Sequence, residues 1–111
     1  MVYKILVGSY TSSVSLLTFD PSSSPPTLKL SSSAEVGHHP SWITRHPALK
    51  DIAIATVEQS DGKLAVLKIV GDKVEVAANV SSGGEDPAHC EVLEDEVIVG
   101  NVCVFPSTVN T

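Results

Sequence analysis

Two stretches of the sequence share one pattern and decide the fold: "VGHHPSWIT" at residues 36–44 and "GGEDPAHCEV" at residues 83–92. In each, a glycine and two polar residues precede a proline, and an apolar run follows. The two prolines, Pro40 and Pro87, lie 47 residues apart. At this spacing "PSWITRH" aligns with "PAHCEVL", and "KILVGSYTSSVSLLTF" near the start shows the same hairpin pattern. A period of about 40 to 50 residues indicates a repeated supersecondary unit.

The segments between the turns predict ten short β-strands and no helix. Valine dominates the apolar residues, and β-branched side chains favour strands. Asp-Gly in "QSDG" (59–62) is a strong hairpin signal, and "GDK" (71–73) marks another tight turn. A four-stranded unit recurring at this spacing is typical of a β-propeller blade, with a β-sandwich as the alternative.

The predicted units are three strands of a first blade (1–37), a complete second blade (38–83), an incomplete third blade (84–106) and a tail (107–111). In the third unit, "EVIVGN" continues directly into "VCVFP". Two antiparallel strands need a connection of at least about two residues. Either "VIVGNVCVF" is one long strand, or a deletion interrupts the blade.

The order of "YKILVGSYT", "VSLLTFDP", "VGHHPSWITRHP", "IAIATVEQSDGKLAVLKI" and "SSGGEDPAHCEV" resembles the opening of the seven-bladed propeller lactonases. This family includes propeller-type 6-phosphogluconolactonases and fungal carboxy-cis,cis-muconate cyclases. The resemblance implies an all-β, incomplete β-propeller of about two and a half four-stranded antiparallel blades. In a complete member the C-terminus would supply the innermost strand that the first blade lacks.

The implied parent activity is hydrolysis of a sugar lactone such as 6-phosphogluconolactone, and a truncated chain is expected to be inactive alone. One alternative is an isomerase of the muconate cyclase type. The other is a non-catalytic β-sheet fragment that self-associates or pairs with another chain through its exposed strand edges.

Composition restricts the partners. The net charge of −6 and the absence of any basic run argue against nucleic acid and anionic membranes. The first apolar stretch is too short for a signal peptide, and no segment has transmembrane length, so we expect a cytoplasmic protein that acts on a small lactone or sugar acid. Cys90 and Cys103 form no metal or disulfide pattern, and we expect neither a metal nor a cofactor.

Four residues are candidates for the site that the resemblance implies. His89 opens an innermost strand near the central channel, where a neutral imidazole could act as general base; a strand-capping role is the alternative. Glu58 ends the strand "IAIATVE" where the family often carries a glutamate; a solvated charge is the alternative. His39, with His38 beside it, and Arg45, the only arginine, are candidates for binding substrate.

Overall fold

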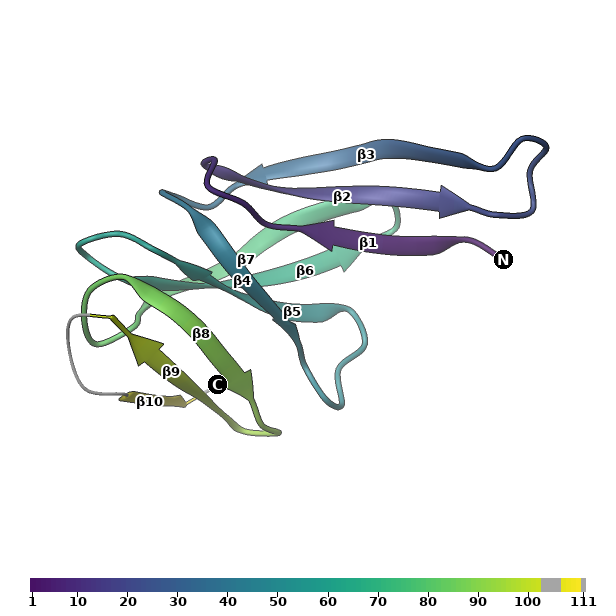
Figure 1. Ribbon diagram of the computed structural model, residues 1–111. Coiled ribbons are helices and arrows are strands. Elements are labelled where there is room, and N and C mark those ends of the chain that lie inside the picture. The colour runs from purple at the N-terminus through teal and green to yellow at the C-terminus, as the bar shows by residue number, and fades with distance from the viewer. Residues whose placement is uncertain (103–106, 111) are drawn as a thin grey trace.

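The computed structural model describes residues 1–102 and 107–110, and all of its regular elements are β-strands in three antiparallel sheets (Figure 1). Sheet 1 contains β1 (Tyr3–Val7), β2 (Ser13–Asp20) and β3 (Thr27–Glu35). Sheet 2 contains β4 (Pro40–Arg45), β5 (Ile52–Val57), β6 (Lys63–Val70) and β7 (Lys73–Ser81). Sheet 3 contains β8 (Pro87–Val92), β9 (Glu96–Asn101) and β10 (Ser107–Asn110). The all-β prediction is confirmed, and the described part contains no helix that could span a membrane.

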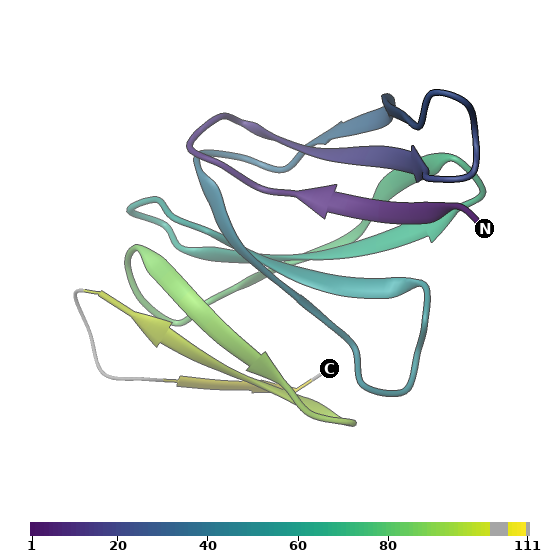
Figure 2. The ribbon, with the colours of Figure 1, turned by 45° about the vertical axis from the view of Figure 1, so that its right-hand side comes forward.

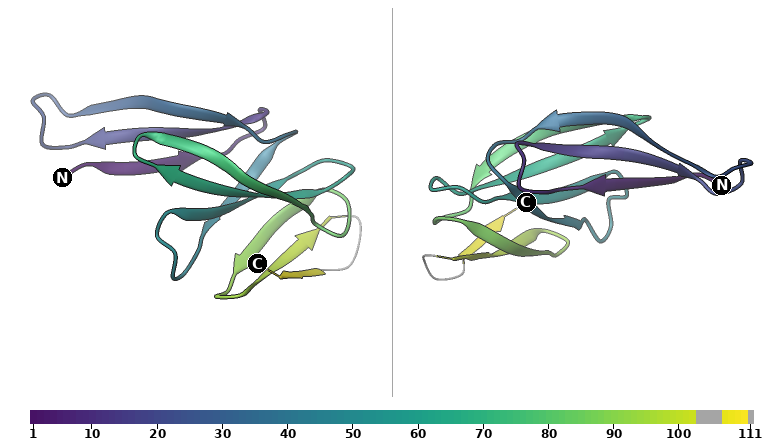
Figure 3. Two further views of the ribbon diagram at one scale, coloured as in Figure 1. Left: turned by 180° about the vertical axis from the view of Figure 1, so that it is seen from behind. Right: turned by 45° about the horizontal axis from the view of Figure 1, so that its top comes forward.

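Sheet 2 lies between the other two sheets, as the views in Figures 2 and 3 show. Its second strand, β5, reads "IAIATV" without polar alternation because both of its faces are covered. Ala53, Ala55 and Val57 pack against sheet 1, whereas Ile54 packs against sheet 3. The near-continuous apolar run of β5 therefore indicates a strand whose two faces are both covered by other sheets.

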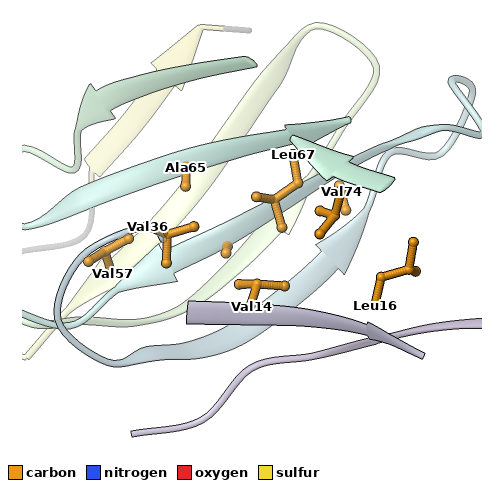
Figure 4. Close-up of a cluster of buried hydrophobic side chains, with 9 residues drawn as sticks. Val14, Leu16, Val36, Val57, Ala65, Leu67 and Val74 are labelled. Atoms are coloured by element: carbon orange, nitrogen blue, oxygen red, sulfur yellow. The ribbon is translucent and has the colours of Figure 1, made fainter. Parts of the chain in front are cut away.

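Two separate cores hold the sheets together. Between sheets 1 and 2, Val14 and Leu16 of β2 belong to the same buried cluster as Leu67 and Val74 (Figure 4). Between sheets 2 and 3, a second buried cluster comprises Ile54, Leu64, Cys90, Val92, Val97 and Val99. Each fully buried Val or Leu contributes about 1.5 to 3 kcal/mol, so these clusters are the main force that stacks the sheets.

The sequence repeat recurs in the backbone. His39 and Asp86, one residue before the two aligned prolines, are the described non-glycine residues with positive φ, 56° and 52°. Each is followed by a register shift, between Pro40 and Trp42 and between Pro87 and His89. Residues of β4 and β8 that are 47 positions apart in the sequence therefore occupy equivalent positions in sheets 2 and 3.

The end of the third sheet differs from the prediction. Strand β9 ends at Asn101, and Val102 lies in a bend where its N–H donates to the Asp86 carbonyl at 3.1 Å, so the alternative of one long strand is wrong. The predicted strand over 102–106 otherwise falls on residues 103–106, outside the described ones. Residues 107–110, predicted as a tail, form β10 and pair antiparallel with β9. Thr and Val in "STVN" favour a strand once an open sheet edge is available.

Candidate functional site

Glu58 and His39 meet in one hollow at the end of the molecule where β4 begins and β5 ends. Antiparallel pairing of Pro40 with Val57 brings the two residues together. The hollow has a volume of about 570 Å³. It is lined by Tyr10, His38, His39, Glu58, Gln59, Ser60 and Asp86.

The ring of His39 lies between two other rings. The centroid of Tyr10 is 4.7 Å away and that of His38 is 3.4 Å away. The backbone fixes this position, because the His39 N–H donates to the Thr11 carbonyl and the His39 carbonyl accepts from the Glu58 N–H, each at 3.0 Å. The positive φ of His39 is thus held from both neighbouring segments.

His38 is oriented by the strand end opposite it. Its N–H donates to Gln59 Oε1 at 3.0 Å, and its Nδ1 lies 3.1 Å from the Glu58 carbonyl oxygen. A carbonyl oxygen only accepts, so Nδ1 carries the proton in this contact, and Nε2 is the basic nitrogen of the neutral ring. The lining of the hollow therefore includes both imidazole and carboxylate groups.

The charge of this hollow is unfavourable to anions. Glu58 and Asp86 bring two carboxylates, and the lining residues that the structure describes include no Lys or Arg. Such a site can accept protons and bind hydroxyl groups, but an anion needs cationic donors from elsewhere. The described residues also hold no group of three or more His, Cys, Asp or Glu side chains placed to bind a metal ion.

His89 is not among the residues that line this hollow. Its ring lies 4.4 Å from the ring of Trp42, and its Nε2 lies 3.9 Å from Glu91 Oε1. About half of its side chain, 53%, is exposed. Trp42 is the equivalent of His89 in sheet 2, and its Nε1–H points to Thr44 Oγ1 and to the Cys90 carbonyl. The two equivalent residues thus form a separate aromatic pair on adjacent first strands.

Arg45 lies far from His39 and Glu58. It ends β4, whereas His39 precedes the start of the same strand, and six residues of extended chain span about 20 Å. Arg45 lines a different hollow of about 460 Å³ together with Lys4, Lys50 and Asp51. The structure therefore does not bring the arginine to the hollow around Glu58.

Tyr10 was not among the candidate residues, although its motif, Gly8-x-Tyr10-Thr11, was visible. A Cβ on Gly8 would lie 2.2 Å from the Pro40 carbonyl oxygen, so only glycine permits this close approach. The Tyr10 ring then lies tilted against the ring of His39, and the Thr11 carbonyl accepts the His39 N–H. The motif encodes the contact between sheet 1 and the first strand of sheet 2.

Cys90 does not offer a nucleophile. It is a free thiol, fully buried in the core between sheets 2 and 3. Burial raises the pKa of the Cys90 thiol to about 11. Near neutral pH the thiol is protonated and unreactive.

Three successive antiparallel sheets, stacked face to face with a repeated strand entry, define a β-propeller type of architecture. The family model described as "Lactonase, 7-bladed beta-propeller" matches residues 4–101, and the chain belongs to this family. The described residues form three sheets where the family name implies seven blades, so the prediction of an incomplete propeller is confirmed. Comparison with curated proteins and with solved structures found no significant match.

Proposed function

We propose that the hollow around Glu58 and His39 forms part of a site that hydrolyses a sugar lactone such as 6-phosphogluconolactone. The observation that carries the proposal is the convergence of Glu58, His38 and His39 in one hollow of a lactonase-family chain. The cytoplasm is the proposed location, and the free thiol of Cys90 is compatible with a reducing compartment.

The reaction needs a base and a group that stabilises the oxyanion. Water attacks the lactone carbonyl carbon while the Glu58 carboxylate takes its proton. An imidazole N–H of His39 stabilises the negative charge on the carbonyl oxygen. The ring C–O bond then breaks, the leaving oxygen takes the proton back from Glu58, and the product is the open hydroxy acid.

His89 and Arg45 have separate proposed roles. His89, whose ring is tilted against that of Trp42, is a second candidate base or an apolar contact for the substrate ring. Arg45 contributes no contact to a phosphate bound near Glu58, because it lies at the other end of β4. A phosphorylated substrate would therefore need its cations from outside the described lining residues.

The experiment is lactone hydrolysis followed by proton release, with Glu58→Gln as the test variant. Glu75→Gln, on the exposed outer strand β7, is the matched control. We expect the lactone to bind, and any activity above buffer to fall about 100-fold or more in Glu58→Gln and to be unchanged in Glu75→Gln. Equal rates in all three proteins, or no rate above buffer together with no binding of the lactone, would contradict the proposal.

A further inference from the structure

Gln59 joins the β3–β4, β5–β6 and β7–β8 connections, which meet at one end of the sheets (Figure 1). Its Oε1 accepts the His38 N–H at 3.0 Å, and its Nε2 donates to the Asp61 carbonyl at 3.0 Å. Its own carbonyl accepts the Asp86 N–H at 2.9 Å. One half-buried residue therefore binds the two neighbouring connections that surround the hollow with Glu58.

The two partners of the Gln59 amide fix which way it points. A backbone N–H only donates and a carbonyl oxygen only accepts, so Oε1 faces His38 and Nε2 faces Asp61. Gly37 leaves room for this arrangement. A Cβ at Gly37, where φ is 123°, would lie 3.2 Å from Gln59 Oε1 and 2.9 Å from Val57 Cγ1. A side chain at this position would therefore be strained and would press on the amide.

The contact with Gln59 places the ring of His38. While the His38 N–H is held by Gln59, its Nδ1 lies 3.1 Å from the Glu58 carbonyl oxygen and carries the proton of the neutral ring. Nε2 is then a hydrogen-bond acceptor, and it makes no hydrogen bond with the described residues. Because His38 is exposed and lines the hollow, a hydroxyl group of a ligand can donate to this nitrogen.

We propose that Gln59 is a positioning residue that holds His38 in the Nδ1–H tautomer, so that Nε2 accepts a hydrogen bond from a hydroxyl group of the bound lactone. This inference rests on the proposed function for its ligand and narrows the substrate class to lactones that carry hydroxyl groups. Glu58 and His39 keep their roles in the reaction, and His38 recognises the substrate. A site built to bond a hydroxyl group discriminates against an analogue that lacks it.

The tautomer of His38 is measured first, in the full chain without ligand. Two-dimensional ¹⁵N–¹H NMR of the neutral imidazole distinguishes a protonated Nδ1 from a protonated Nε2. We expect Nδ1–H in the wild type and a shift towards Nε2–H in Gln59→Met, which keeps the length of the side chain and loses both polar atoms. Gln59→Glu keeps an acceptor for the His38 N–H and should keep the Nδ1–H form.

Asp61→Asn is the matched control for both variants of Gln59. The Asp61 carboxylate is exposed and pairs with Lys63, whereas Gln59 contacts only the backbone carbonyl of Asp61. The control therefore alters the same turn and leaves the contact of Gln59 in place. We expect the His38 tautomer of Asp61→Asn to be that of the wild type.

The contact with a hydroxyl group is measured with two stable lactams, which have the ring of a lactone and resist hydrolysis. Gluconolactam carries the sugar hydroxyl groups, and δ-valerolactam carries none. We expect Gln59→Met to bind gluconolactam about five- to tenfold more weakly than the wild type does, which corresponds to the loss of one hydrogen bond. Its affinity for δ-valerolactam should not change, and Asp61→Asn should bind both lactams as the wild type does.

Two results would overturn the role of Gln59. One is an Nε2–H tautomer of His38 in the wild type, and the other is equal affinity of the wild type and Gln59→Met for gluconolactam. A wild-type chain that does not bind gluconolactam at all contradicts the proposed function and with it the hydroxyl contact, whereas the tautomer still tests the positioning by Gln59. Far-ultraviolet circular dichroism of each variant establishes that the fold is kept.

Discussion

The ring of Trp42 lies 4.4 Å from the ring of His89, the residue that occupies the equivalent position in the next repeat. Trp42 also donates its Nε1–H to Thr44 Oγ1 at 2.7 Å and to the Cys90 carbonyl at 3.2 Å. One side chain of sheet 2 thus contacts both a side chain and the backbone of β8. The Trp42–His89 pair therefore connects β4 and β8, the first strands of sheets 2 and 3.

Replacing Trp42 tests how much this connection stabilises the chain. Trp42→Ala loses the ring contact and the hydrogen bonds, and we expect a loss of about 2 kcal/mol in the free energy of unfolding. Trp42→Phe keeps a ring and should lose about 1 kcal/mol. Urea unfolding followed by circular dichroism measures both. Equal stability of Trp42→Ala and wild type would show that the contact is incidental.

His46 should stabilise the folded chain at least as much as Trp42 does, although it does not line the hollow around Glu58. It is buried, its Nδ1 accepts from the N–H groups of Ala48 and Leu49, and its Nε2 lies 3.1 Å from the Glu94 carbonyl. His46→Ala leaves three backbone groups without this partner, and we expect a loss of about 2 to 4 kcal/mol. Chemical denaturation of His46→Ala beside Arg45→Ala, an exposed neighbour, checks this. A smaller loss in His46→Ala than in Arg45→Ala would contradict it.

Thr56 is a position where a substitution should not destabilise the chain. Its hydroxyl is fully buried and has no hydrogen-bond partner within the described residues. Thr56→Val has nearly the same shape and removes the unsatisfied group, so we expect a gain of up to about 1 kcal/mol. Thermal unfolding compares Thr56→Val with Thr56→Ala, which leaves a cavity and should destabilise. A marked loss in Thr56→Val would mean that the hydroxyl has a partner.

The raised pKa of Cys90 predicts a dependence of stability on alkaline pH. The folded thiol has a pKa of about 11 against 9.0 for the ordinary group. Between these values the unfolded chain loses the proton first, so stability is retained below pH 9 and falls as the pH rises towards 11. Unfolding curves of a Cys103→Ser variant and a Cys90→Ala, Cys103→Ser variant measure this. The fall should be smaller without Cys90, and parallel curves would contradict the assignment.

Some of this structure could be predicted from local pattern. Asp-Gly and Gly-Asp turns and alternating apolar residues predicted the strands, and the offset between Pro40 and Pro87 predicted the repeat. Strand β10 was missed, because "STVN" is short, has a single apolar residue and forms a strand beside the open edge of β9. Its strand character depends on a neighbour in space.

Strand pairing and sheet packing together decide where the candidate residues lie. Glu58 and His39 end and begin neighbouring antiparallel strands, so pairing alone brings them together. Arg45 lies at the far end of the same strand, and the direction of β4 excludes it from that hollow. Tyr10 reaches His39 only because sheet 1 stacks on sheet 2. Contacts between sheets depend on packing that no single motif encodes.

The proposed function requires that a sugar lactone binds at Glu58 and His39. The most direct measurement is a titration of ¹⁵N-labelled chain with gluconolactone, followed by the backbone amide signals. We predict saturable shifts centred on Tyr10, His39 and Glu58 that are lost in Glu58→Gln and kept in Glu75→Gln. Shifts confined to the hollow around Arg45, or no shifts at saturating lactone, would contradict it.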